Sequence, residues 1–297
     1  MPEYDERVER ILEEERIFRT EEDLRTFSQY RLRSHFSSGS GRIVMSRLLK
    51  SLIWQAYERI SVGKEGGILG NLRTFWYRNV KPTVSRVPKK YLPESGAYDL
   101  MLTCFREMVY EHGLFSYSDF DFTDENWEHR RIGVENPGVI VFAEKTGWIR
   151  TLREIHERYD VTVMALGGFS SALSSEYTAR HVSERLEEGE AVHLVGIVDY
   201  DYSGRLIALN FRNQLEAMGL EVESLELLIK PDHFDQEEID LFSYPLSTKE
   251  ETKLENWLRE TNGIEGAARG LESEAMPLFR LHELVEKSIG KILSRQS

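Results

Sequence analysis

The chain has 297 residues, of which 40% are hydrophobic and 30% charged, and its formal net charge is −13. This composition is typical of a soluble globular protein long enough for two hydrophobic cores. No segment approaches the roughly eighteen apolar residues of a membrane span, and the acidic start of the chain does not resemble a secretory signal. Because Cys104 is the single cysteine, we expect a reducing cytoplasm as the location, near the nucleoid if the cell is prokaryotic.

Charge is distributed unevenly along the chain. Between Leu24 and Pro93 there are 14 lysines and arginines and two acids, a net of +12, whereas the remaining residues carry a net of −25. Such asymmetry suggests a basic module that binds a polyanion, joined to an acidic module with another task. We therefore expect double-stranded DNA as a partner of the basic part, whereas a uniformly acidic chain would exclude it.

The first residues are predicted to form an N-terminal helical arm over 1–41. Apolar residues at helical spacing predict helices over Glu3–Arg16 and, with an N-cap at its start, over Thr20–Phe36. A longer amphipathic helix is then predicted over Ile43–Ser61, beyond a flexible break of serines and glycines. The arm is expected to serve docking rather than chemistry.

Residues 42–136 are predicted to form a mainly α-helical, winged-helix domain that binds DNA. Asn71 is expected to cap a short helix that ends before Pro82, and a further helix is expected over Tyr98–His112. Alternating aromatic residues over Leu114–Val134 suit a β wing. This order of elements is that of a winged-helix module, and the alternative is another small helical domain. The positive charge favours DNA binding.

Residues 137–297 are predicted to form an α/β domain with a Rossmann-like, doubly wound parallel sheet. Continuous apolar runs alternate with helical patterns, which is typical of parallel strands joined by right-handed crossovers. The expected strands cover Val139–Ala143, Val161–Ala165, His193–Val198 and Glu226–Ile229.

Acidic residues follow two of these strands. Glu144 comes directly after the first strand, and Asp199 and Asp201 come after the third. Side chains two residues apart on a strand point to the same side, and open α/β sheets place their sites at the carboxyl ends of strands. If the two strands are neighbours, three carboxylates converge and would hold Mg²⁺, or Mn²⁺ in its place. The alternative is that the aspartates only cap the following helix.

The same acids carry a resemblance to a known fold family. Glu144-Lys145 after an apolar strand, followed by Asp199-x-Asp201-x-x-Gly204, resembles a Toprim domain. That fold is shared by topoisomerases, bacterial primases and some nucleases. The resemblance implies that the glutamate and the two aspartates are the metal ligands.

A segment of the basic region between Leu24 and Pro93 resembles one particular family among the Toprim proteins. Leu72–Val80 is similar to the segment of the A subunit of topoisomerase VI, and of the related meiotic double-strand-break protein, that holds the DNA-cleaving tyrosine. Tyr77 takes that position, four residues after Arg73. Two departures are Thr74, where the family often has an acid, and Tyr202, where it often has proline. With its short length, the chain resembles a compact, Mini-A-like member.

The resemblance implies Mg²⁺-dependent DNA cleavage by transesterification. Tyr77 would attack a phosphodiester to form a 5′-phosphotyrosyl link, and Arg73 would stabilise the charge of the transition state. A homodimer would make a double-strand break, as the A subunit of a type II, ATP-hydrolysing DNA topoisomerase does. No ATP-binding motif is visible in the chain, so ATP use would require a separate GHKL-type ATPase B subunit. Contacts to DNA phosphates are expected from Arg78, Lys81, Arg86, Lys89 and Lys90.

Other interpretations stay open from the sequence. Tyr77 could pack in a core, Arg73 could be a plain phosphate contact, and Glu274 could be a further metal ligand. The cluster Asp232-His233-x-Asp235 is interpreted as a solvated turn rather than a ligand set. Two alternative functions are a Toprim nuclease that hydrolyses DNA with metal-activated water, and a DNA-binding subunit that acts only with a partner ATPase.

Overall fold

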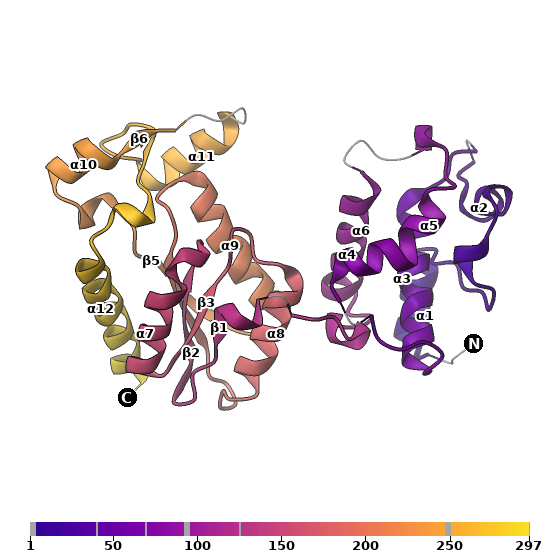
Figure 1. Cartoon of the computed structure of the whole chain (residues 1–297), viewed down its shortest axis with the longest axis horizontal. Helices are drawn as coiled ribbons and strands as arrows, with labels where there is room; N and C mark the ends of the chain where they lie inside the picture. Colours follow the sequence, from indigo (N-terminus) through magenta and orange to yellow (C-terminus); the bar gives the residue numbers. More distant parts are fainter. Residues whose placement is uncertain are drawn as a thin grey trace. The chain divides into compact units, whose positions relative to one another are not determined.

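The computed structural model describes residues 4–39, 41–68, 70–91, 96–124, 126–246 and 251–296. The chain divides into two compact units, Met1–Asp124 and Glu125–Ser297, which are coloured along the sequence in Figure 1 and are described here one at a time. The predicted boundaries after residues 41 and 136 differ from this division. The predicted arm is part of the first unit, and residues 126–136 belong to the second.

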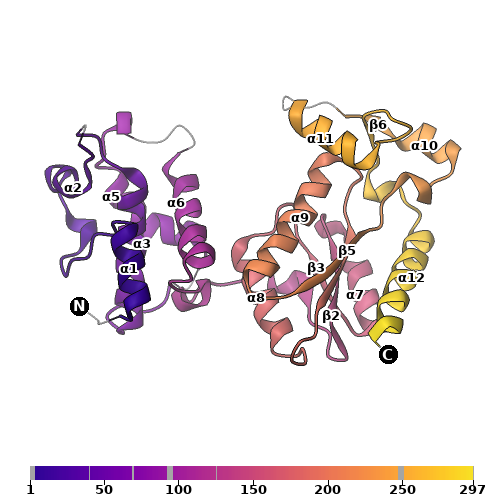
Figure 2. The ribbon, with the colours of Figure 1, turned by 180° about the vertical axis from the view of Figure 1, so that it is seen from behind.

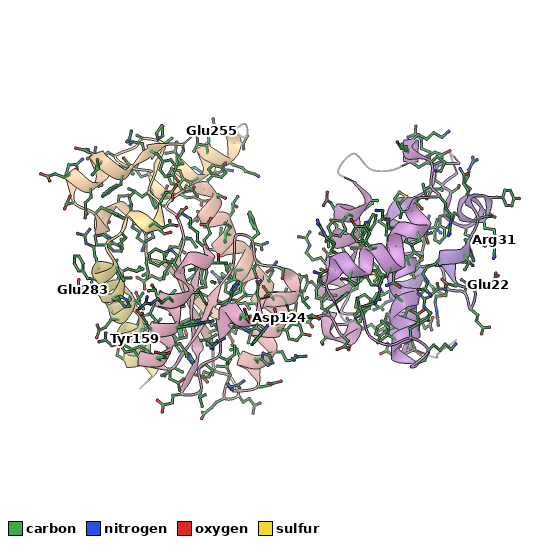
Figure 3. The ribbon with its side chains drawn as sticks, viewed as in Figure 1. Glu22, Arg31, Asp124, Tyr159, Glu255 and Glu283 are labelled. Atoms are coloured by element: carbon green, nitrogen blue, oxygen red, sulfur yellow. The ribbon has the colours of Figure 1, made fainter. Side chains whose placement is uncertain are left out.

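The first unit is built from helices around α3. Its helices are α1 (Glu6–Glu14), α2 (Gln29–Phe36), α3 (Met45–Ser61), α4 (Leu72–Phe75), α5 (Lys81–Val84) and α6 (Ala97–Arg106). Ten residues of α3 are buried, so this helix forms the centre of the core. The second helix begins later than predicted, because Ser28 rather than Thr20 caps it. Glu22 and Arg31, labelled in Figure 3, form an ion pair of 2.7 Å that ties α2 to the segment before it.

The β wing predicted over Leu114–Val134 does not form in the first unit. Among the described residues of this unit, β pairing is limited to two isolated bridges. Four aromatic side chains of the segment, Phe115, Tyr117, Phe120 and Phe122, are buried instead, whereas Trp127 is exposed. Phe120 and Phe122 stack on each other with ring centroids 5.4 Å apart. Phe105 of α6 packs edge-on against Phe120 at 5.2 Å. These rings bury more apolar area in a helical core than they would in an exposed hairpin, which accounts for the difference.

The second unit holds a mixed α/β fold. Its strands are β1 (Arg130–Arg131), β2 (Asn136–Ala143), β3 (Val161–Ala165), β4 (Val192–Ile197), β5 (Val222–Leu227), β6 (Tyr244–Pro245) and β7 (Arg269–Gly270). Its helices are α7 (Ile149–Tyr159), α8 (Ala172–Ser183), α9 (Tyr202–Ala217), α10 (Gln236–Phe242), α11 (Glu251–Thr261) and α12 (Leu278–Gln296). None of the described helices is long and apolar enough to cross a membrane.

The main sheet has the strand order β1-β3-β2-β4-β5. The four longer strands run parallel, as predicted, but β1 joins β3 in the antiparallel sense, so the sheet is mixed. Strand β5 ends at Leu227, earlier than the predicted Ile229. Helices α7 and α12 pack on one face, and α8 and α9 pack on the other, as Figures 1 and 2 show from opposite sides.

The elements α10, α11, β6 and β7 lie together beyond the carboxyl ends of the strands (Figures 1 and 2). Tyr200, after β4, pairs with Leu271 in an antiparallel bridge, and its hydroxyl donates to the carbonyl of Gly263 at 2.9 Å. Its ring also packs against Trp257 of α11 at 5.3 Å. These contacts attach the C-terminal segment to the end of the sheet where the predicted acids lie.

Candidate active-site residues

The three predicted acids lie at one end of the sheet. Strands β2 and β4 are neighbours in register, with Ala143 opposite Ile197, so the condition on which the three carboxylates were expected to converge is met. The backbone N–H of Asp199 donates to the Glu144 carboxylate at 3.3 Å. Asp201 follows two residues later at the same end. The sheet therefore brings Glu144 and the aspartate pair together, as the sequence predicts.

Asp201 is held by contacts from two directions. One carboxylate oxygen accepts from the backbone N–H of Gly204 at 2.7 Å, which makes Asp201 the N-cap of α9. The other accepts from the Tyr244 hydroxyl at 3.1 Å. Burial, reinforced by the nearby Asp201 charge, raises the pKa of Tyr244, so that the hydroxyl stays protonated as a donor. Asp201 therefore caps α9, and this contact leaves lone pairs on its carboxylate for a second role.

The proline-to-tyrosine departure at Tyr202 has a local explanation. Tyr202 is the first residue of α9, directly after the N-cap Asp201. Proline is favoured at this position because its missing N–H has no intrahelical partner there, but other residues also fit. The capping geometry is preserved without proline.

Lys145 places an ammonium group among carboxylates. Its Nζ lies 3.0 Å from Asp199, 3.1 Å from Glu272 and 2.5 Å from Glu274. Burial would lower the pKa of Lys145, but hydrogen bonds to these carboxylates outweigh it and raise the pKa. The ammonium is therefore charged at neutral pH and offsets part of the negative charge at this end of the sheet.

The C-terminal segment completes this cluster. The backbone N–H of Ser273 donates to Asp199 at 2.8 Å, and its hydroxyl donates to Glu274 at 3.1 Å. The indole N–H of Trp148 in turn donates to the Ser273 hydroxyl at 3.3 Å. The sequence singled out Glu274 as a possible metal ligand. It gave no sign of the contact of Ser273 with Asp199 or of Lys145 with Glu274, because these contacts join residues 74 and 129 positions apart.

The Glu144 carboxyl is partly buried beside two other acids. Desolvation by burial raises its pKa, and the charges of Asp199 and Asp201 raise it further. The adjacent ammonium of Lys145 counteracts this shift only in part. A carboxylate held in this way is stabilised by any additional cation that reaches it.

The donor set fits a hard divalent cation, although not in its present arrangement. Among the described residues, no three acidic, histidine or cysteine side chains are placed to hold a metal ion as they stand. The oxygens of Asp199 are engaged by Lys145 and Ser273, and those of Asp201 by Gly204 and Tyr244. Carboxylate oxygens are nevertheless the ligands that Mg²⁺ prefers, and the cluster already accommodates one cationic group. Metal binding by Glu144, Asp199 and Asp201 stays a prediction.

A cavity of about 700 Å³ opens beside the aspartates. It is walled by apolar side chains of β5 and α11, and it has Arg205 and Lys230 among its polar lining residues. Arg205 is paired with Glu260 at 2.6 Å. The cluster Asp232-His233-x-Asp235 at its margin is a turn, as expected, since Asp235 caps α10 and His233 bonds to the Leu228 carbonyl.

Tyr77 lies in the first unit on a helical segment opened as predicted. Asn71 caps α4, and its side chain accepts from the backbone N–H of Thr74 at 2.9 Å. The Thr74 hydroxyl in turn accepts from the backbone N–H of Asn71. Thr74 thus completes a capping box, the role that a side chain at this third helical position commonly takes. This contact explains the threonine where the resembling family often has an acid.

The helix does not end before Pro82, contrary to the prediction. It continues through a π-helical turn, Trp76–Val80, into α5, and the N–H of Lys81 donates to Trp76 five residues back. Proline has no N–H and its ring clashes with the carbonyl four residues earlier, so a widened turn lets the chain pass without that clash. The turn occupies the segment that carries Tyr77.

The Tyr77 side chain is exposed, so the core-packing alternative is wrong. Its exposed fraction is 55%, and Lys81 places its Nζ 4.5 Å from the ring centroid. Arg73, also exposed, lies over the ring of Tyr98 with its guanidinium carbon 5.5 Å from the centroid. The neighbouring Phe75 is fully buried, and it anchors the segment in the aromatic core.

The five residues predicted to contact DNA phosphates are all exposed: Arg78, Lys81, Arg86, Lys89 and Lys90. Arg86 also has a structural role, because it donates to the backbone carbonyls of Arg25 at 2.6 Å and Phe27 at 3.2 Å. Arg78 and Lys89 are exposed, and neither takes part in an ion pair within the described residues. Both cationic side chains are therefore accessible to solvent.

No model of a known protein family matches the sequence, and no curated protein compared with it matches.

Proposed function

We propose that the chain cleaves double-stranded DNA by forming a covalent phosphotyrosyl link through Tyr77. The observation that carries the proposal is the exposed phenol on a cationic helical segment, with Lys81 against its ring and Arg73 one turn away. The acids Glu144, Asp199 and Asp201, which follow the carboxyl ends of β2 and β4 in the other unit, supply the proposed Mg²⁺ or Mn²⁺ site.

In this proposal the second unit is a Toprim-type domain, and the first is a winged-helix type without the β wing. The strand order places the glutamate and the aspartate pair on neighbouring parallel strands, which supports the first assignment. The capped helix with its exposed tyrosine supports the second. Two copies of the chain, each contributing its Tyr77, would cut both strands of a duplex. A GHKL-type ATPase as a further partner would make the protein the A subunit of a type II topoisomerase.

The reaction is an exchange of one phosphodiester for another. The Tyr77 phenol loses its proton to water and its oxygen bonds to phosphorus. The bond from phosphorus to the 3′ oxygen breaks, and that oxygen takes up a proton from water. A phenol in water has a pKa of about 10, so a phenol nucleophile needs nearby positive charge at neutral pH. In this proposal Lys81, whose Nζ lies 4.5 Å from the Tyr77 ring centroid, and Arg73, one helical turn before Tyr77, supply such charge. Bound Mg²⁺ would neutralise charge on the phosphate oxygens.

The test uses supercoiled plasmid incubated with the protein and Mg²⁺ or Mn²⁺ and stopped with detergent. We expect linear DNA with protein covalently attached to both 5′ ends, detected by retention of the ends with the protein fraction. Linear DNA with free 5′ phosphates would show hydrolysis by metal-activated water instead, which the acid cluster of the second unit could perform without the tyrosine. Cleavage only after addition of an ATPase subunit would identify a protein that acts within a complex.

The exposed cations predict the salt dependence of DNA binding. Replacing Arg78 with alanine removes about one phosphate contact, so the slope of log affinity against log salt should decrease by about 1. Fluorescence anisotropy with a labelled duplex measures the slope. Lys287→Ala, at an exposed position of α12, is the matched control and should leave the slope unchanged. An unchanged slope in Arg78→Ala would remove this residue from the DNA interface.

A further inference from the structure

The ammonium of Lys145 stands where a second cation would have to bind. Lys145 follows Glu144 directly, and its Nζ is 3.0 Å from one oxygen of Asp199. Lys145 is thus related to two of the proposed metal ligands: it is adjacent in sequence to Glu144, and its ammonium forms an ion pair with Asp199. A divalent cation that used this oxygen of Asp199 would meet the positive charge of Lys145 at close range.

Lys145 also has partners outside the three predicted acids. Glu272 and Glu274 lie 3.1 Å and 2.5 Å from its Nζ, and both carboxylates are more than half exposed. Asp199, in contrast, has only 10% of its side chain exposed. The ammonium can therefore leave the buried partner and keep its two solvated ones with a rotation of its flexible side chain.

The same contacts hold the carboxylates together. Without a cation, the mutual repulsion of Glu144, Asp199 and the C-terminal acids would separate the ends of β2 and β4 from the segment at Ser273. Lys145 offsets this repulsion at the position where the segments meet. Removing the charge of Lys145 should therefore have two effects. The metal-free protein should become less stable, and the affinity of the acid cluster for a metal ion should increase.

We propose that Lys145 is an internal counter-ion of the acid cluster, which a divalent cation displaces from Asp199 and which thereby sets the affinity of the site for metal. The inference rests on the proposed metal site of Glu144, Asp199 and Asp201. Lys145 is a positioning residue in this scheme, since it holds the ligands in place until the metal replaces it. A monovalent ion carries no more charge than the ammonium, so the exchange favours divalent ions.

The test compares the wild-type protein with Lys145→Met, which keeps the length of the side chain and removes its charge. Mn²⁺ binding is measured by titration calorimetry, and thermal unfolding is measured with and without Mn²⁺. We expect Lys145→Met to bind Mn²⁺ about tenfold more tightly, because an ion pair no longer has to be broken. Without metal, the variant should unfold at a lower temperature than the wild type. The two changes have opposite signs, which a purely structural role does not produce.

Two control variants distinguish the effect of the Lys145 charge on Mn²⁺ affinity from the effect of the net charge of the protein. Lys145→Arg restores the charge and should bring Mn²⁺ affinity back to that of the wild type or below it. Lys287→Met removes a lysine from the exposed surface of α12 and should leave Mn²⁺ affinity unchanged. Equal or weaker Mn²⁺ binding by Lys145→Met, with clear binding by the wild type, would overturn the inference alone.

A measurement on the wild-type protein covers the case in which Lys145→Met does not fold. Acetylation of lysines with a water-soluble ester is followed by mass spectrometry at increasing Mn²⁺. The labelling rate of Lys145 should rise with Mn²⁺ while that of Lys287 stays constant, and a constant rate at both lysines would overturn the inference. No Mn²⁺ binding by any of the proteins would overturn the metal site itself, and this inference with it.

Discussion

Tyr77→Phe is expected to abolish covalent attachment of the protein to DNA. The substitution removes the attacking oxygen and leaves the ring, which is exposed and contributes little to the core. Loss of a covalent nucleophile lowers the rate by a factor of about 10³ or more in enzymes that depend on one. The measurement is the amount of protein-linked 5′ ends formed from supercoiled plasmid in a single turnover. DNA affinity should change little, because the cations around Tyr77 remain.

The matched control for this substitution is Tyr30→Phe. Tyr30 is 81% exposed in the same unit, and its hydroxyl should not contribute to the reaction. We expect this variant to form the same amount of covalent product as the wild type. Covalent product from Tyr77→Phe at the wild-type rate would assign the nucleophile to another residue. Cutting that survives Tyr77→Phe with free 5′ phosphates would instead favour hydrolysis at the acid cluster.

Gly204→Ala should strongly destabilise the second unit. A Cβ at Gly204 would lie 2.3 Å from the carbonyl oxygen of Asp199, a backbone atom that has no flexible way to move aside. The first turn of α9 would have to separate from the loop that carries Asp199 and Asp201. We expect a loss of about 3 kcal/mol in the free energy of unfolding, the upper part of the usual range for overpacking. Urea unfolding followed by circular dichroism, with hydrogen exchange of β2 and β4 as a local probe, measures it.

A second glycine supplies the control with the opposite sign. Gly290 is an exposed position in the middle of α12, and a Cβ there would meet no atom within 4 Å. Alanine is favoured over glycine in a helix by about 1 kcal/mol, so Gly290→Ala should stabilise the unit slightly. Equal stabilities of Gly204→Ala and the wild type would show that the loop and α9 can separate freely. The aspartates would then not be positioned by this close approach.

Local signals in the sequence predicted several features correctly. The cap at Asn71 depends on a contact with Thr74 three residues away, and so a short motif is sufficient to predict it. The parallel strands β2 and β4 follow from continuous apolar runs, which are buried on both faces of the sheet. Because carboxyl ends of neighbouring parallel strands meet at one edge, Glu144 and the Asp199 pair could be placed there from the sequence.

Other features depended on competition between distant segments. The alternating aromatic residues before Asp124 suited a hairpin by their period, but packing against Phe105 made them part of a helical core. The π-helical turn at Trp76–Val80 carries the chain past Pro82, where a local rule predicts an end. In both cases a local preference of small free energy was outweighed by burial and backbone hydrogen bonding in the folded unit.

The sequence by itself determined which residues could perform chemistry: a tyrosine on a basic segment and three acids at strand ends. Only the tertiary structure decided how those residues are held. It exposed Tyr77 beside Lys81, and it brought Glu272 and Glu274 to Lys145 across more than 120 positions of the chain. The physical reason is the range of the interactions, since strand periodicity and helix caps act over a few residues. The counter-ion of the acid cluster, in contrast, depends on a C-terminal segment that folds back onto the sheet.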